Sequence, residues 1–179
     1  MLRSRDAHLR AARIICDAGG ALVGRTRLQK VSYLTELAGF PGGFEFEYRH
    51  YGPFSDDLAS AMEIATGLGL VEEEERRAEW GGRYSIYRST DRTPPSNDNS
   101  QVQFVTAAAK IGAIELELAA TAAFLYADEG IGRNRSGDPW AETARRKPDK
   151  AGDGRLERAK TAYRRLRALS TPEPLPPIA

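Results

Sequence analysis

Two short stretches decide the fold: residues 28–34 read LQKVSYL, and residues 50–58 read HYGPFSDDL. Apolar residues in the first stretch recur at helical spacing, which predicts a helix from about Thr26 to Gly39. In the second stretch Ser55 precedes two aspartates, and a serine followed by carboxylates is a signal for a helix start. We therefore expect the next helix to run from about Ser55 to Thr66.

The segments on either side complete an N-terminal lobe. Residues 5–18 have the apolar periodicity of a helix, and aromatic and charged residues alternate over 44–49 as in a short strand. Gly52 tolerates an unusual φ and Pro53 presets the first helical φ, so this pair can turn the strand abruptly into the next helix. Residues 68–89 indicate a β-hairpin around a Trp-Gly-Gly turn. Helices followed by a strand hairpin are the order of a winged helix-turn-helix.

The remaining chain follows a linker rich in Pro, Ser, Asn and Asp, and its periodicity predicts helices. We therefore expect a mainly α fold (α+β), in which a winged-helix-like lobe with a small β-hairpin is joined to a helical C-terminal lobe. The expected units are the winged-helix-like lobe over residues 1–92, the linker over 93–100, the helical lobe over 101–170, packed on the first, and a Pro-rich, extended and mobile tail over 171–179.

Composition excludes several classes of protein. The chain of 179 residues carries 26 basic and 25 acidic side chains, and its net charge of +1 excludes a polycation that binds nucleic acid by bulk charge. One cysteine excludes a disulfide framework and a thiolate zinc site, and two histidines make a metal centre unexpected. No apolar run reaches the roughly 20 residues of a membrane span, and the N-terminus reads as charged rather than as a signal peptide. We expect a cytoplasmic protein with no cofactor, no metal and no membrane contact.

The two opening stretches carry a resemblance to known families. LQKVSYL resembles the "LQKLxYF" signature of the YwgA-like proteins and of the related Panacea (SocA-like) antitoxin domain. HYGPFSDDL resembles the "YGPYSxxL" motif of the first group or the "xGPV" motif of the second. Residues 67–71 look like the step that follows in these families, and residues 146–149 look like their "KP" step before the last helix. Panacea members commonly have a tryptophan near the Gly-Pro pair, and its absence from residues 48–51 favours the YwgA-like branch.

The resemblance implies a small, largely helical protein with a winged-helix-like portion, from a prophage, toxin–antitoxin or defence setting. Panacea members act as antitoxins that bind varied toxins, whereas the YwgA-like group has no defined activity. Neither family has defined catalytic residues. We therefore expect a non-enzymatic protein-interaction module that is antitoxin-like, or an accessory protein associated with mobile elements or phage defence. The sequence leaves the partner and the oligomeric state open, a dimer included.

The residue types of a nucleophilic triad do occur together, at His50, Ser55, Asp56 and Asp57, but five to seven residues apart on one corner. A catalytic chain is hard to form within so short a segment, and the sequence has no nucleophile elbow, P-loop or dinucleotide motif. Glu115 and Glu117 differ by two helical positions and should face apart. We expect no catalytic site.

A protein-binding surface is expected where the first turn of one helix meets the Gly-Pro corner, because cations there oppose the helix dipole and lie beside aromatic residues. The alternatives are solvated charges and aromatic rings that belong to the core. The expected partner-binding residues are Arg25, Arg27, Lys30, His50, Tyr51, Gly52 and Pro53. The residues expected to be mostly buried together are Leu28, Val31, Tyr33, Leu34, Phe46, Tyr51, Phe54 and Leu58.

The alternative function is a winged-helix-type DNA-binding transcriptional regulator. The helix at 55–66 has three acidic side chains and no basic one, so a recognition helix there would repel phosphates. Basic charge is concentrated instead at residues 133–167, with twelve basic and five acidic side chains. A solvated helix face is the commoner explanation of such a run. The nucleic-acid contacts expected under this alternative are Arg158, Arg164, Arg165 and Arg167.

Overall fold

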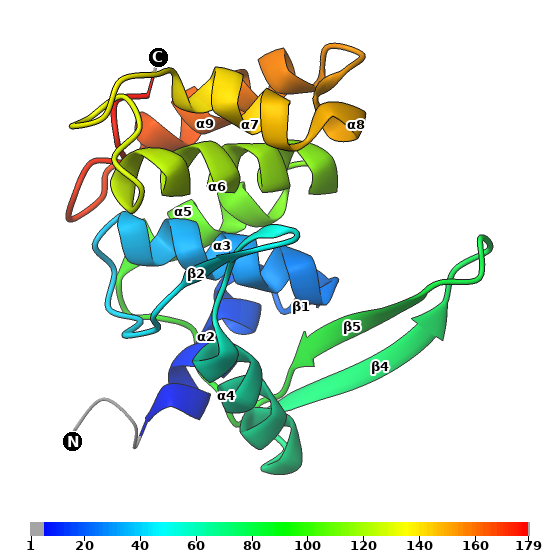
Figure 1. Ribbon diagram of the computed structural model, residues 1–179. Helices are drawn as coiled ribbons and strands as arrows, with labels where there is room; N and C mark the ends of the chain where they lie inside the picture. Colours follow the sequence, from blue (N-terminus) through cyan, green and yellow to red (C-terminus); the bar gives the residue numbers. More distant parts are fainter. Residues whose placement is uncertain (1–5, 179) are drawn as a thin grey trace.

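The computed structural model describes residues 6–178, and it has the mainly α, mixed α+β fold that the sequence predicts (Figure 1). None of the helices in this range is long and apolar enough to cross a membrane. The helices are α2 (Ala7–Asp17), α3 (Arg25–Leu37), α4 (Asp56–Gly67), α5 (Asn99–Ala109), α6 (Ala113–Ala127), α7 (Pro139–Arg146), α8 (Pro148–Ala151) and α9 (Arg155–Arg167). The strands are β1 (Ala21–Val23), β2 (Glu47–Arg49), β3 (Gly52–Phe54), β4 (Val71–Arg77) and β5 (Arg83–Ser89).

The N-terminal helices are followed by the predicted hairpin, which projects from the body of the molecule (Figure 1). The antiparallel strands have the order β1-β5-β4, with Leu22 of β1 opposite Tyr87 of β5. Among residues 6–178, β1 pairs only with residues 86–88 of β5, so the part of the hairpin nearer its turn has two strands. Three of the four consecutive glutamates on β4 form ion pairs with arginines. Trp80 at the turn is 83% exposed.

Of the two helix starts predicted at the opening stretches, that of α4 is confirmed at its residue and that of α3 lies slightly earlier in the chain. Ser55 caps α4 as expected, since its Oγ accepts a hydrogen bond from the Leu58 N–H at 3.2 Å. Thr26 does not cap α3, because the chain enters that helix through Gly24 at a φ of +101° and the helix already includes Arg25.

The Gly-Pro pair does not open a helix, which corrects the prediction for Gly52 and Pro53. Both belong to β3, where Gly52 pairs with Arg49 and Pro53 pairs with Tyr48 of the antiparallel β2. The sharp turn therefore lies at residues 50–51, one step earlier than expected. The reason is that the aromatic segment folds back on itself as a hairpin before the chain enters α4.

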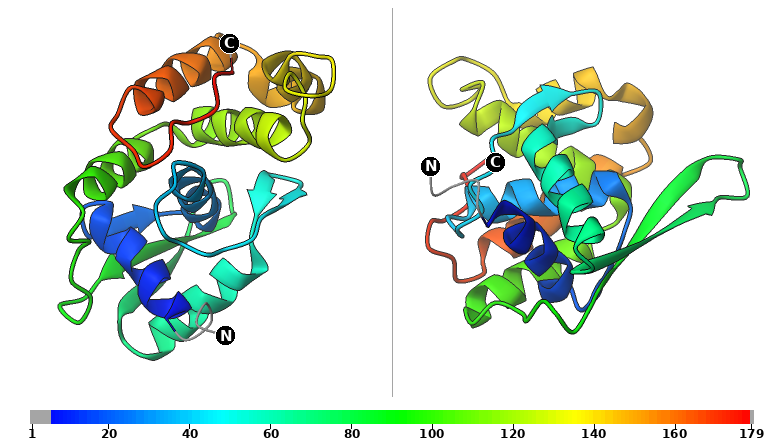
Figure 2. Two further views of the ribbon diagram at one scale, coloured as in Figure 1. Left: turned by 90° about the vertical axis from the view of Figure 1, so that its left-hand side faces the viewer. Right: turned by 90° about the horizontal axis from the view of Figure 1, so that it is seen from below.

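The C-terminal helices lie on the N-terminal ones in layers. In Figure 2, α6 covers α3, and α7 and α9 lie on the outer side of α6. The layers share one apolar core, as the rings of Phe40 and Phe104 show, with centroids 5.8 Å apart. The linker is attached to the body as well, because the buried Asp17 carboxylate accepts hydrogen bonds from the Ser96 N–H at 2.8 Å and from Gln101 Nε2 at 3.0 Å.

The C-terminal tail packs against the body and is not the free extension expected from its prolines. Leu175 and Ile178 are buried, and the Tyr163 hydroxyl donates to the Pro176 carbonyl at 2.8 Å. The Glu173 N–H also donates to the Ala38 carbonyl at 3.0 Å, at the end of α3. The two apolar side chains among the prolines explain the docking, because their burial favours an ordered tail.

Candidate functional site

The segments with the LQK, Gly-Pro and Arg-Lys-Pro motifs meet at one place in the structure. Lys30 comes from α3, Lys147 comes from the step between α7 and α8, and both lie beneath the β2–β3 hairpin at Glu117 of α6. We call the set Lys30, Glu117, Lys147 and Lys150 the lysine corner.

The centre of the lysine corner is the buried Glu117 carboxylate. Its Oε1 lies 2.7 Å from the Nζ atoms of both Lys147 and Lys150, and its Oε2 lies 2.8 Å from Lys150 Nζ. The side chains of Glu117 and Lys147 are only 6% and 5% exposed. A buried charge is costly unless it is paired, so these contacts fix the position of α8 and the end of α7 against α6.

Lys147 also reaches the hairpin above it. Its Nζ donates to the His50 carbonyl at 2.9 Å, and the guanidinium of the preceding Arg146 lies 5.0 Å from the ring centroid of Tyr48. Arg146 is held in turn by Glu129 at 2.7 Å. The Arg-Lys-Pro step therefore holds the β2–β3 hairpin from the C-terminal side.

The LQK stretch holds the same segment from the other side. Gln29 forms two hydrogen bonds with the backbone of Ser55, at 3.0 Å to its carbonyl and at 2.8 Å from its N–H. Lys30 Nζ donates to the Pro53 carbonyl at 2.7 Å. These pairings lie 23 to 26 residues apart in sequence, and they explain why the two opening stretches occur together.

Lys30 is an unusual cation because its side chain is almost wholly buried. Burial lowers its pKa to about 7; Glu117 raises this pKa, while Lys147 and Lys150 lower it. Burial therefore disfavours the charged form of Lys30, and the hydrogen bond of its Nζ to the Pro53 carbonyl offsets part of that cost.

Close packing at the corner requires a glycine at position 52. Gly52 has a φ of +89°, and a Cβ built there would lie 2.5 Å from Thr121 Oγ1 and 3.8 Å from Lys30 Cε. Thr121 Oγ1 is buried and has no hydrogen-bond partner among the described residues. The β2–β3 hairpin thus lies against α6 with no space for another side chain.

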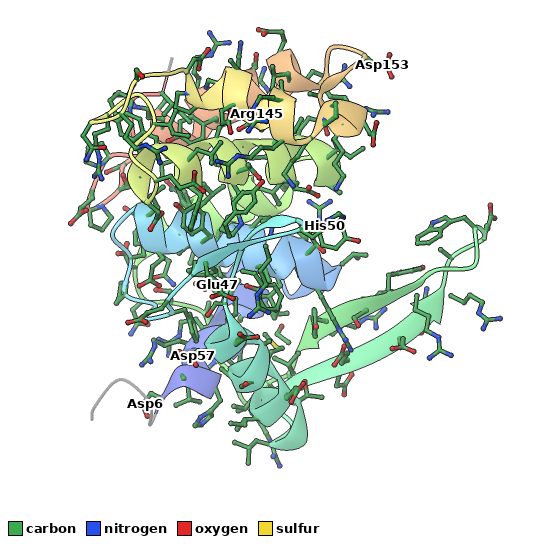
Figure 3. All side chains as sticks on the ribbon, viewed as in Figure 1. Asp6, Glu47, His50, Asp57, Arg145 and Asp153 are labelled. Carbon is green, nitrogen blue, oxygen red and sulfur yellow. The ribbon has the colours of Figure 1, made fainter. Side chains whose placement is uncertain are left out.

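Above this support the turn itself is open to solvent. His50 is exposed and Tyr51 is 51% exposed, and their rings meet edge to face at a centroid distance of 4.7 Å. Lys150 Nζ lies 4.8 Å from the Tyr51 ring centroid. Figure 3 shows His50 at the tip of the turn, on the side from which the β4–β5 hairpin projects. We call His50 and Tyr51 the aromatic turn.

The predicted partner-binding residues do not form one continuous surface. Arg25 pairs with Glu73 of β4 at 2.9 Å, and Arg27 donates to the Ala109 carbonyl at the end of α5 at 2.9 Å. The prediction of Lys30 as an exposed contact is wrong, because its side chain is buried and its Nζ donates to the Pro53 carbonyl. Gly52 and Pro53 are likewise buried and serve to position the aromatic turn.

The predicted burial of the motif side chains holds for most of them. Phe46 and Phe54 are half-buried, and Tyr51 is the exception because it belongs to the aromatic turn. The fully buried members are Leu28, Val31, Tyr33, Leu34 and Leu58.

The four nucleic-acid contacts predicted on α9 differ in what their guanidinium groups bind, and that of Arg164 donates to the Lys160 carbonyl one turn earlier at 3.4 Å. Arg158 pairs with Glu115 at 3.0 Å, and Arg167 Nε donates to the Leu175 carbonyl of the tail at 3.0 Å. Arg164 and Arg165 are exposed, and neither forms an ion pair within residues 6–178. In the same range no group of three or more His, Cys, Asp or Glu side chains could hold a metal ion.

Sequence reasoning missed Glu117 and Lys150. The expectation that Glu115 and Glu117 face apart is confirmed, since Glu115 pairs with α9 and Glu117 with the lysine corner. A charged residue within the apolar run of α6 was the available signal, because a carboxylate buried among leucines and alanines needs a cationic partner.

Comparison with known proteins gives one relative. The chain is similar to an uncharacterized protein of Bacillus subtilis (strain 168), YwgA, with 30% identity over 81 residues. The matched stretch is 45% of this chain and 46% of the relative, so it spans less than half of either. No protein family model matches the chain. The similarity supports the YwgA-like resemblance of the motifs, and the relative's name states no activity.

Proposed function

We propose that this chain is a non-enzymatic protein-interaction module that contacts its partner through the aromatic turn. The observation that carries the proposal is that two motif segments, distant from each other in sequence, hold an exposed turn of the third from below. Lys147 binds the His50 carbonyl and Lys30 binds the Pro53 carbonyl, while the rings of His50 and Tyr51 face solvent. Aromatic side chains held rigidly at a surface are the type that dominates interface energetics.

The charge at the turn favours a partner with acidic groups. Three lysines face one carboxylate at the lysine corner, and Lys150 is partly exposed beside Tyr51. This leaves a local surplus of positive charge next to an aromatic ring, to which a carboxylate of a partner is attracted.

Within this class the proposed role is that of an antitoxin-like protein or of an accessory protein for mobile elements or phage defence, with a toxin or a defence-system component as the partner. Support comes from the motif resemblance to the YwgA-like and Panacea families. The test is growth of cells that express the product of a neighbouring gene with and without this chain. Rescue by the wild type, and its loss in a His50→Ala, Tyr51→Ala variant, is expected.

Co-purification from native extract tests the interaction itself. A tagged wild-type chain is compared with His50→Ala, Tyr51→Ala and with a control, Ile64→Ala, Leu68→Ala. The control residues lie at α4 and are 52% and 51% exposed, which matches Tyr51. A stoichiometric partner is expected with the wild type and the control, and not with the turn variant, at unchanged melting temperature. A folded turn variant that keeps every stoichiometric partner would contradict the proposal.

A second candidate is the winged-helix-type DNA-binding regulator, favoured by Arg164 and Arg165, which are exposed and form no ion pair with any of residues 6–178. Against it, Asp56 and Asp57 are exposed at the start of α4, where a recognition helix would meet phosphates. Duplex binding is expected to be weak and non-specific, with log affinity falling linearly with log salt. A footprint on a defined operator that survives neutralisation of Arg164, Arg165 and Arg167 would favour DNA binding through another surface.

A further inference from the structure

An apolar groove runs between the end of α5, the start of α6 and the exposed side of α9. Its volume is about 520 Å³, which is within the range of ligand sites in proteins. Three of the residues that line it are small: Ala107, Ala162, and Gly112, which is the N-cap of α6. The apolar side chains that line it are Ala107, Ile111, Ala162, Leu166 and Leu169.

Arg27 of α3 fixes the chain between α5 and α6, next to the groove. Its guanidinium donates to the carbonyls of Ala109, the last residue of α5, at 2.9 Å, and of Ile111, which lies between the two helices. Burial lowers the pKa of Arg27, but the group stays charged because its ordinary pKa is so high. The fixed bend between α5 and α6 makes the groove a preformed feature of the fold.

The rim of the groove is cationic. Lys110 and Arg165 line it, both are exposed, and neither has an ion-pair partner in the described range 6–178. Arg158 also lies on the rim, but its charge is offset by Glu115 at 3.0 Å. An apolar floor with unpaired positive charge at its edges thus remains open to solvent.

The apolar floor and the cationic rim together favour one kind of occupant. A nucleic-acid duplex would use the rim cations but would cover the apolar floor with phosphates and sugars, which gain nothing from that contact. An amphipathic helix uses both parts, because its apolar face fills the groove while acidic residues at its flanks meet the rim. Ala162 and Leu166 lie four residues apart on α9, and Leu169 follows just after the helix ends, so the apolar floor continues along this side of the groove.

We propose that this groove is a docking site for an acidic amphipathic helix of a partner protein. The site shares no residue with the aromatic turn or the lysine corner. It therefore gives the molecule a second contact surface, and it stands whether or not the aromatic turn binds a partner.

Fluorescence anisotropy with the full-length chain tests this site. The probe is a labelled helical peptide with leucines on one face and glutamates elsewhere, and the control probe carries lysines in place of the glutamates. We expect saturable binding of the acidic peptide and binding of the basic peptide that is weaker by about tenfold or more, equivalent to about 1.4 kcal/mol. Equal binding of the two peptides, or binding of neither, would overturn the proposal.

Two variants and a matched control locate the binding. Arg165→Glu reverses a rim charge, whereas Arg164→Glu makes the same change at the neighbouring residue, which does not line the groove. Arg165→Glu is expected to weaken the acidic peptide about tenfold and Arg164→Glu less than about twofold. Ala162→Leu fills the floor and is expected to weaken it as well, at unchanged melting temperature.

The same variants identify any other occupant. Equal losses in Arg165→Glu and Arg164→Glu, or no loss in Ala162→Leu, would show that the peptide binds by diffuse charge and would refute the docking site. Self-association that Ala162→Leu abolishes, or duplex DNA binding that Arg165→Glu abolishes without any peptide binding, would assign the groove to a second copy or to DNA and overturn the proposal.

Discussion

Gly52 links backbone geometry to the candidate site. Its positive φ is rarely adopted by other residues, and Thr121 Oγ1 occupies the space that a side chain would need. The resemblance to known motifs marked Gly52 from sequence, whereas Thr121 lies 69 positions away and no local pattern connects the two. Contacts between residues that are close in the sequence can be predicted from it, whereas contacts between residues that meet only in the folded protein cannot.

Substitution of Gly52 by alanine is expected to destabilise the protein by about 1–3 kcal/mol from backbone strain, with a further cost from the contact with Thr121. Gly19→Ala is the matched control, because its φ is +102° and nothing lies within 4 Å of the added Cβ. Urea unfolding measures both. Equal losses of stability in the two variants would show that the close contact at Gly52 has no energetic effect.

Lys30 is the residue whose observed environment differs most from the one predicted from the sequence. A cation in the first turns of a helix resembles a solvated charge, and only the distant Pro53 carbonyl and Glu117 make its burial tolerable. The consequence is a link between stability and pH. The pKa of Lys30 falls from 10.5 to about 7 on folding, so between these values the unfolded state binds more protons than the folded state.

The free energy of unfolding should therefore rise with pH above about 7, by up to about 1.4 kcal/mol per pH unit from this group. Below that pH the cost of burying the charged lysine is fully present. Lys30→Met should flatten the profile measured by urea unfolding from pH 7 to 9, whereas Lys110→Met, at an exposed site, should leave it unchanged. A wild-type profile as flat as that of Lys30→Met would contradict the burial of a titrating lysine.

The longer helices and the β4–β5 hairpin follow from local signals. Apolar periodicity with nearby start and stop residues predicts α2, α3 and α4 close to their observed bounds. Short elements were missed: β1 has three residues and exists through pairing with β5, and α8 has four residues and depends on the contact of Lys150 with Glu117. Such elements are stabilised by tertiary contacts that leave no periodic pattern in the sequence.

The docking of α7 and α8 on α6 is expected to depend on Glu117. Glu117→Gln leaves buried lysines without their counter-charge, which should cost about 3–5 kcal/mol. Glu115→Gln, two positions along the same helix, breaks the pair with the exposed Arg158 and should cost less than about 1 kcal/mol. Thermal or urea unfolding compares the two. Similar small losses would mean that the lysine corner does not hold the helices together.

In the whole molecule, the two halves of the chain and the tail share one core. Packing of the helical lobe on the first was expected, but burial of the Pro-rich tail was not, since the tail has the composition of a mobile segment while Leu175 is 1% exposed. Two apolar side chains in a short tail form no periodic pattern. Their burial depends on the tertiary surface that they contact, which the sequence pattern does not show. The order of the longer helices and of the β4–β5 hairpin, by contrast, follows from their local signals and was predictable.

Leu175→Ala is expected to lower the free energy of unfolding by about 2–5 kcal/mol, as for other fully buried leucines. Ser170→Ala, at an exposed position just before the tail, should have little effect. The comparison is made by urea unfolding of the full chain. A loss below about 0.5 kcal/mol for Leu175→Ala would show that the tail does not contribute to the core.

Site-specific photocrosslinking in native cells tests most directly whether the aromatic turn meets a partner. A photoreactive phenylalanine derivative replaces Tyr51 in one variant and Leu68 in the other, and both native side chains are 51% exposed. The predicted result is a discrete adduct with one protein from position 51 and none of that size from position 68. No adduct from position 51, or the same adduct from both positions, would contradict a binding surface at the turn that Lys30, Lys147 and Glu117 support.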